Sequence, residues 1–153
     1  MTEPAEVTVT RTIAATPERL YSLISDLPQM GKWSPENNGG KWLKGATGPT
    51  VGAEFKGKNR NGWRRWNTIS TVVAADSGKE FAFDVNATGF DVARWGYRLT
   101  PVEGGTEVTE YWIDRRSPLI AKITGMAVGV RDRSTHNRAG MEHTLERLAA
   151  AVE

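Results

Sequence analysis

The sequence predicts an α+β protein in which one antiparallel sheet packs against a C-terminal helix. Three observations lead to this prediction. The first strand-like segment alternates apolar and polar residues with a period of two. Glycine- and asparagine-rich breaks then recur between short β-like segments from residue 36 to residue 105. The stretch from residue 123 to residue 152 contains no proline, and its later part has helical periodicity.

The N-terminal part predicts one strand followed by two short helices. Residues 6–13 place valine and isoleucine on one side and threonines on the other, as in a half-buried strand. Thr16 then offers an N-cap hydroxyl, and Pro17 occupies the first helical position. Pro28 is expected to end this helix. Residues 30–35 predict a second helical turn.

The middle of the chain predicts consecutive hairpins in one meander. The expected strands are residues 39–43, 51–58, 63–74, 79–85, 93–101 and 106–114. The connections at residues 59–62, 76–78 and 103–105 each contain glycine, which supplies the positive φ that tight turns need.

One stripe of the predicted C-terminal helix changes character along its length. Its apolar part is Met141, Leu145, Leu148 and Val152. Followed backwards, the same stripe contains Asn137, Ser134 and Val130. A helix packed wholly on a dry core does not become polar in this way. Either the first half of the helix extends into solvent, or it faces a cavity.

Length and composition exclude several classes of protein. A chain of 153 residues fits a single domain over 1–153 and is too short for a (β/α)8 barrel of roughly 250 residues. The absence of cysteine excludes disulfides, thiolate metal sites and a cysteine nucleophile. A net charge of +2 gives no support to nucleic-acid binding. The start lacks the features of a secretory signal and no window predicts a membrane span, so we expect a cytoplasmic protein.

Three stretches of sequence resemble a known superfamily. They are residues 13–26 with the following Trp33-Ser34-Pro35, residues 41–59, and residues 94–101 with 105–109. These stretches and the order of elements resemble the START-like, or helix-grip (SRPBCC), superfamily, specifically its bacterial polyketide cyclase/dehydrase and lipid transport type. The resemblance implies a curved antiparallel sheet of six to seven strands wrapped around a long C-terminal helix. It also implies a hollow between them for an apolar or amphipathic small molecule.

The two histidines do not predict a metal site. Oxygenase subunits of this superfamily hold iron with two histidines and a carboxylate, whereas this chain has only His136 and His143. Seven residues apart on one helix, the two imidazoles would be separated by about 10 Å along the axis and could not share an ion. We therefore expect solvated histidines on the outer face, with no metal and no cofactor.

Glu110 is the main candidate for acid–base chemistry. Alternation places it on one strand face with Val108 and Trp112, and if that face lines the hollow, burial raises the pKa of its carboxyl group. The alternative is an edge glutamate that is paired on the outside. Arg94 and Arg98 are expected to point outward, so neither would pair with it. Tyr97, on the opposite face from those arginines, is a hydroxyl donor for the same reaction.

A larger set of residues is predicted to contact the ligand. Aromatic side chains would present rings to it or fill the core, and we expect a mixture of the two roles. Polar groups of the helical stripe would orient its oxygen atoms. The predicted ligand-binding residues are Trp33, Phe81, Phe83, Trp95, Trp112, Ser134, Asn137 and Met141.

The basic stretch 56–66 has two interpretations. It carries five cations and two tryptophans without an acidic residue, which is the composition of a contact to nucleic acid or to an anionic surface. The alternative, which we favour, is a hairpin with a basic tip whose tryptophans turn into the sheet. Accordingly we expect no nucleic-acid partner.

Together these patterns predict a protein, monomeric or homodimeric, that binds a polyketide- or lipid-like molecule in an internal cavity. Glu110 and Tyr97 would serve a cyclase/dehydrase reaction. The alternative is a carrier or sensor without chemistry.

Overall fold

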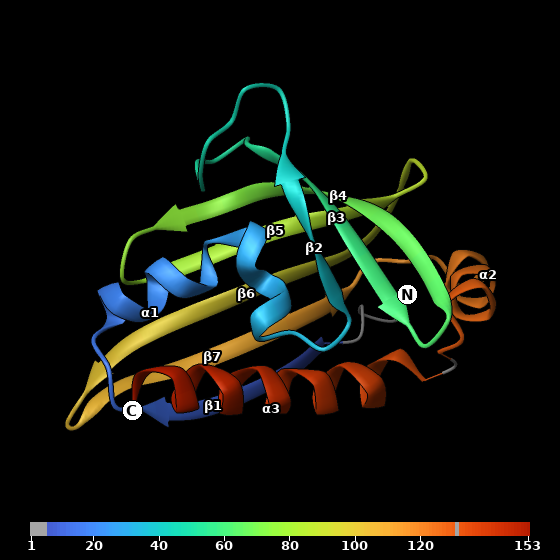
Figure 1. The fold of residues 1–153 in the computed structure, drawn as a ribbon. Coiled ribbons are helices and arrows are strands. Elements are labelled where there is room, and N and C mark those ends of the chain that lie inside the picture. The colour runs from blue at the N-terminus through green and yellow to red at the C-terminus, as the bar shows by residue number, and fades with distance from the viewer. Residues whose placement is uncertain (1–5, 131) are drawn as a thin grey trace.

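The computed structural model describes residues 6–130 and 132–153. In chain order the elements are β1 (Glu6–Ile13), α1 (Pro17–Ile24), η1, a 3-10 helix (Leu27–Lys32), β2 (Asn37–Trp42), β3 (Glu54–Asn61), β4 (Arg64–Asp76), β5 (Glu80–Ala87), β6 (Phe90–Val102), β7 (Gly105–Asp114), α2 (Pro118–Val128) and α3 (Arg133–Val152). This is the predicted α+β helix-grip architecture (Figure 1).

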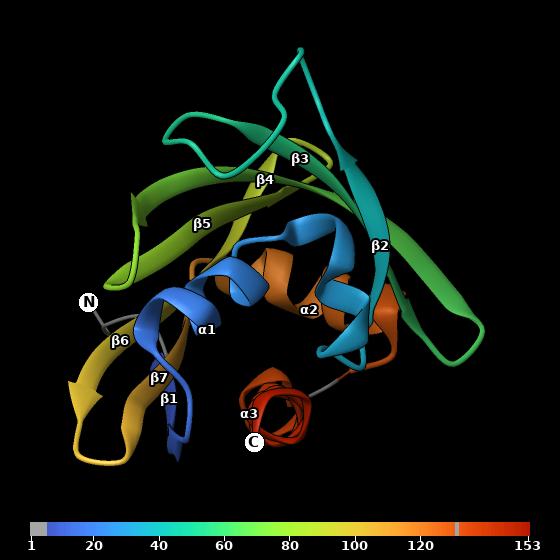
Figure 2. The same cartoon turned by 60° about the vertical axis from the view of Figure 1, so that its left-hand side comes forward.

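The seven strands form one antiparallel sheet in the order β1-β7-β6-β5-β4-β3-β2. The chain therefore pairs its first strand with its last and otherwise runs as a meander. Register shifts interrupt the ladders in β2–β3, β4–β5 and β5–β6, and such bulges increase the twist and bending of a sheet. Seen along α3, the sheet curves around that helix, with α1 and η1 between them (Figure 2).

Local signals explain how the first helix begins. The Thr16 side chain accepts a hydrogen bond from the Arg19 amide, and Pro17 occupies the first turn, as predicted. The second helical turn covers Leu27–Lys32, so it begins three residues earlier than expected. Pro28 does not terminate α1 but lies in the first turn of this 3-10 helix. Proline is tolerated there because a backbone N–H in the first turn has no partner within the helix.

The C-terminal region contains two helices where one was predicted. The Ser117 side chain accepts from the Ile120 amide and begins α2, which ends at Gly129 with a φ of 76°. The Asp132 side chain then caps α3. The prediction missed α2 because it did not use the Ser-Pro start signal at residue 117 or the glycine stop signal twelve residues later.

The core is concentrated at one end of the molecule. Leu145 and Leu148 of α3 pack there with Leu20 and Ile24 of α1 and with the inner face of the sheet. The N-terminal half of α3 packs against a much smaller cluster that includes Met141 and Trp112. Consequently the apolar part of the helical stripe covers the core, and its polar part faces the space that the core leaves open.

Candidate functional site

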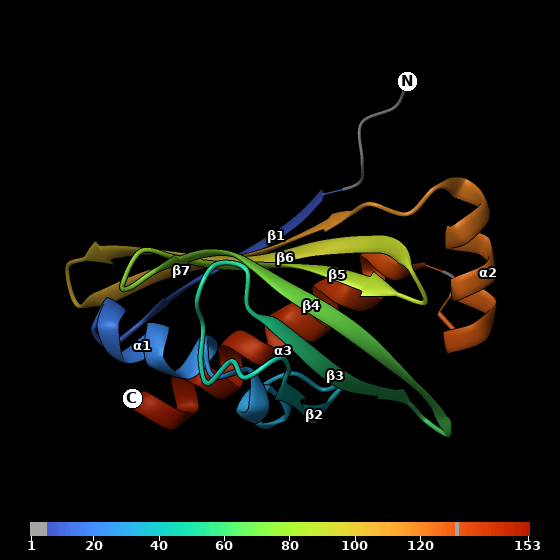
Figure 3. The ribbon, with the colours of Figure 1, turned by 90° about the horizontal axis from the view of Figure 1, so that it is seen from above.

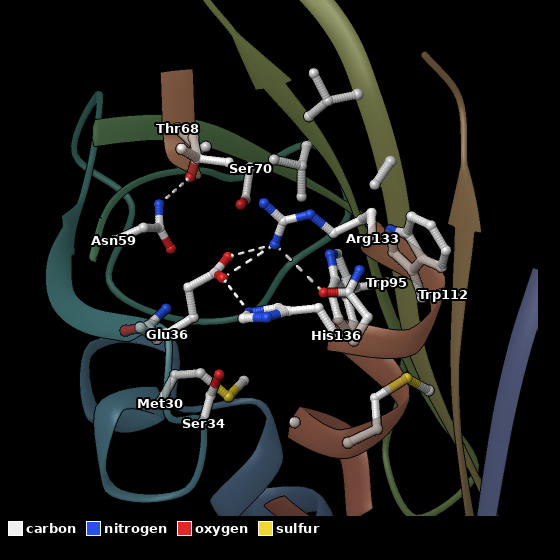
Figure 4. A pocket seen from close by; sticks show the side chains of 18 of the residues that line it. Met30, Ser34, Glu36, Asn59, Thr68, Ser70, Trp95, Trp112, Arg133 and His136 are labelled. Carbon is white, nitrogen blue, oxygen red and sulfur yellow. Dashed lines mark hydrogen bonds and ion pairs between the residues drawn. The ribbon is translucent and has the colours of Figure 1, made fainter. Parts of the chain in front are cut away.

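A cavity of about 200 Å³ lies between the inner face of the sheet and the N-terminal half of α3 (Figure 4). The sheet contributes mainly aromatic and small side chains, α3 contributes polar ones, and Thr124 and Val128 of α2 close one end. Of the predicted polar stripe, Asn137 faces this cavity.

Two aromatic rings form one wall of this cavity. Trp95 on β6 and Trp112 on β7 are directly opposite in the strand register, and their ring centroids are 6.4 Å apart at an interplanar angle of 47°. Phe83 and Trp66 extend the wall onto β5 and β4. Such a surface presents ring faces to an apolar ligand.

The next cross-strand pair carries the only buried carboxyl group among the described residues. Tyr97 and Glu110 are register partners on the same face, and the Tyr97 hydroxyl donates to Glu110 Oε1 at 3.0 Å. Glu110 is 3% exposed, and its Oε2 atom has no hydrogen-bond partner within residues 6–130 and 132–153. The site thus leaves one oxygen atom of a buried carboxyl group free to interact with a ligand.

Burial controls the ionisation of this pair. Desolvation raises the pKa of Glu110 to about 8, and the hydrogen bond from Tyr97 opposes that rise only in part. The pKa of Tyr97 is raised well above its ordinary value by burial and by the neighbouring carboxyl group. At neutral pH Glu110 is therefore mostly a neutral carboxylic acid, which can donate a hydrogen bond from Oε2.

A second polar group lies at another part of the cavity wall. Glu36 accepts two contacts from Arg133 Nη1, at 2.9 and 3.0 Å, and one from His136 Nε2 at 2.8 Å. Arg133 Nη1 also approaches Asn137 Oδ1 at 3.4 Å (Figure 4). The expectation that His136 is solvated on the outer face was wrong, because α3 turns this imidazole toward the cavity and Glu36 binds it.

Of the ten predicted site residues, seven line the cavity. They are Phe83, Trp95, Tyr97, Glu110, Trp112, Asn137 and Met141. As expected, Arg94 and Arg98 lie on the outer face of the sheet, where they pair with Asp84 and Glu80.

Three predicted ligand-binding residues lie outside the cavity wall. Phe81 is on the same face as Phe83 but farther along β5, where its ring packs edge-on against Tyr21 of α1. Trp33 is buried in the main core cluster after η1. Ser134 is absent from the wall, because the cavity-facing side of α3 extends from Asn137 and Met141 toward Arg133 and not toward Ser134.

Sequence reasoning missed Glu36, Arg116 and Arg133 as cavity residues. Glu36 follows the Trp33-Ser34-Pro35 turn, and nothing local indicates that it meets a helix about 100 residues later. Arg116 is held against Asp114 by two contacts of 2.9 Å and donates to Thr124 of α2. Arg133 lies one helical turn before Asn137, so extending the predicted stripe by residues spaced four apart would have found it.

Two further properties bear on the class of protein. In the part of the chain that the structure describes, no group of three or more histidine, aspartate or glutamate side chains could hold a metal ion. None of the helices in that part is both long and apolar enough to span a bilayer.

The architecture defines a helix-grip fold with a cavity between the curved sheet and the C-terminal helix. The family model for "Polyketide cyclase / dehydrase and lipid transport" matches residues 4–153. This chain therefore belongs to the polyketide cyclase/dehydrase and lipid transport family. No curated protein matches the chain closely enough to count as a relative.

Solved structures show the same fold. The Polyketide_cyc-like protein Cgl2372 from Corynebacterium glutamicum is 28% identical, with a TM-score of 0.66 over 99% of this chain and 93% of that one. Protein CV1439 from Chromobacterium violaceum is 18% identical, with a TM-score of 0.73 over 98% and 99% of the two chains. The di-domain ARO/CYC StfQ from the steffimycin biosynthetic pathway is 13% identical, with a TM-score of 0.74 over 97% of this chain and 50% of StfQ.

Proposed function

We propose that this protein binds a small, ring-containing ketone or phenol in its cavity and acts on it by proton transfer through Glu110. The observation that carries the proposal is the free Oε2 atom of Glu110, buried beside the Trp95–Trp112 wall. A buried polar atom without a partner is destabilising, and a ligand carbonyl oxygen would accept its hydrogen bond.

The cavity volume favours a compact ligand. Pockets for drug-sized molecules measure roughly 300–1,000 Å³, whereas this cavity measures about 200 Å³. One or two fused rings match this space better than a long acyl chain does. Membership of a family with polyketide cyclases and the likeness to StfQ support a ligand of this chemistry.

The chemistry that we propose is loss of water from a β-hydroxy ketone. In the protein molecules in which Glu110 is ionised, its Oε2 atom no longer donates to the ligand carbonyl. It instead accepts the proton from the carbon between the two oxygen-bearing carbons. The resulting carboxylic acid then gives that proton to the hydroxyl group, which leaves as water, and Glu110 returns to its starting state. Because a pKa of about 8 keeps most Glu110 protonated at pH 7, the rate should increase as the pH rises toward 8.

Ligand binding can be tested with matched pairs of compounds. We expect 1-tetralone to quench the fluorescence of the cavity tryptophans saturably, and palmitate to bind much more weakly. Glu110→Leu should weaken 1-tetralone about 10-fold, because the hydrogen bond to the carbonyl is lost, and should leave tetralin, the matched hydrocarbon, unaffected. Glu107→Leu, on the exposed face of the same strand, is the control. The absence of any saturable response would contradict the proposed cavity ligand.

Turnover separates an enzyme from a carrier. We expect wild-type protein to convert 3-hydroxy-1-tetralone to 1-naphthol, a dehydration that can be followed by absorbance, and Glu110→Gln to lose this activity while still binding 1-tetralone. Equal rates in both proteins would exclude Glu110 as the proton carrier. Binding of 1-tetralone without any turnover by wild type would identify a carrier.

A further inference from the structure

The basic hairpin and α2 lie next to each other at one end of the molecule. Asn61 Nδ2 donates to the Val128 carbonyl at 2.8 Å, which joins the tip of the β3–β4 hairpin to the end of α2. Both segments lie at the same end of the sheet (Figures 1 and 3). We call this surface, made of residues 58–65 and 117–128, the hairpin–α2 face.

Large apolar side chains of this face are exposed to solvent. Trp63 at the hairpin tip is 80% exposed, so the expectation that both tryptophans of the hairpin turn into the sheet was wrong for Trp63, while Trp66 does line the cavity. On α2, Leu119, Ile123 and Met126 are 66%, 53% and 72% exposed. Their spacing of four and three residues places them on one side of the helix.

The opposite side of α2 is the side that packs against the rest of the protein. Thr124 and Val128 face the cavity, and Val128 is buried. The helix therefore already satisfies its contact with the protein through these residues. Its second apolar stripe has no contact that accounts for it among the described residues.

Charge on this face has a single sign. Residues 56–66 and 115–130 contain no aspartate or glutamate. Among the ion pairs of residues 6–130 and 132–153, none involves Arg60, Arg64, Arg65 or Lys122. The Arg64 guanidinium lies 4.4 Å from the Trp63 ring centroid, which keeps a cation beside the exposed indole.

We propose that the hairpin–α2 face docks on an anionic lipid surface. Exposed aliphatic side chains on one side of a helix, a tryptophan and flanking cations are the features that hold a protein at the interface of a charged bilayer. A nucleic acid would use the cations but not the aliphatic stripe of α2. A second copy of the same face would bring like charges together.

Docking would place α2, one wall of the cavity, directly on the membrane. A lipid-soluble ligand in the membrane would then be separated from the cavity by this helix. This consequence rests on the proposed function, whereas the docking itself does not, and the experiment below tests docking without any cavity ligand.

Sedimentation with vesicles tests the proposal. We expect the full chain to bind vesicles of phosphatidylcholine with 30% phosphatidylglycerol, to bind pure phosphatidylcholine far less, and to dissociate as salt increases. Each cation near an anionic surface contributes about a 5-fold gain in affinity, so Arg65→Gln with Lys122→Gln should weaken binding about 25-fold. Trp63→Ser with Met126→Ser should also lose binding, and both pairs of residues are exposed enough to leave the fold intact.

Matched controls lie at the other ends of the same strands. Lys79→Gln in the β4–β5 turn and Val51→Ser in the β2–β3 loop remove an exposed cation and an exposed apolar side chain and should not change binding. The proposal is overturned if the vesicles do not bind at low salt, or if these controls weaken binding as much as the test pairs. The proposal is also overturned if an oligonucleotide displaces the protein completely from the vesicles and binds the double variant Trp63→Ser with Met126→Ser as tightly as wild type.

Discussion

Glu110→Gln is expected to remove a large pH dependence from the stability of this protein. The pKa of Glu110 is about 8 in the folded protein, against an ordinary value of 4.5. Between these values the native protein keeps a proton that the unfolded chain has released. Stability contributed by this group is therefore full below pH 4.5 and is lost as the pH rises toward 8, by about 1.4 kcal/mol per pH unit.

Urea unfolding of wild type and Glu110→Gln at pH 5, 6, 7 and 8 measures this effect. The unfolding free energy of wild type minus that of Glu110→Gln should decrease steadily from pH 5 to pH 8. Comparing differences cancels the contributions of other titrating groups. Glu107→Gln, exposed on the same strand, should give a constant difference. Parallel pH profiles for wild type and Glu110→Gln would show that the carboxyl group is not held in a desolvated site.

Gly96→Ala is expected to destabilise the fold by about 1–3 kcal/mol through overpacking. Gly96 is the register partner of Tyr111 on the outer face of β6 and β7, and a methyl group there would overlap the Tyr111 ring and hydroxyl. That ring cannot move freely, because its hydroxyl donates to Glu80 Oε2 at 2.9 Å and the Arg98 guanidinium lies 4.2 Å from its centroid.

A double-mutant cycle tests this explanation. In a Tyr111→Ala background the methyl group at residue 96 has space, so Gly96→Ala should then cost little and the two substitutions should be strongly non-additive. Gly48→Ala is the control, because a Cβ atom at that position meets no atom within 4 Å. Equal costs of Gly96→Ala in both backgrounds would locate the destabilisation in the strand backbone rather than in the tyrosine contact.

Local sequence patterns were enough to predict which side chains share a face of each strand and most of the aromatic wall. Side chains alternate along a strand, so Tyr97 and Trp95 had to share one face and Arg94 and Arg98 the other, and the structure agrees. The same rule placed Glu110 with Trp112. The N-cap at Thr16 is equally local, because it needs only the residues of one helical turn.

Which part of the inner face is covered by core and which part lines the cavity depends on the packing of distant elements. Periodicity assigned Phe81 and Phe83 to the same face, but α1 covers only the first of them. Likewise the pairing of Glu36 with Arg133 and His136 joins segments about 100 residues apart, and no local pattern encodes it. Period and capping depend on neighbours in sequence, whereas a cavity is the volume left over after distant elements have packed.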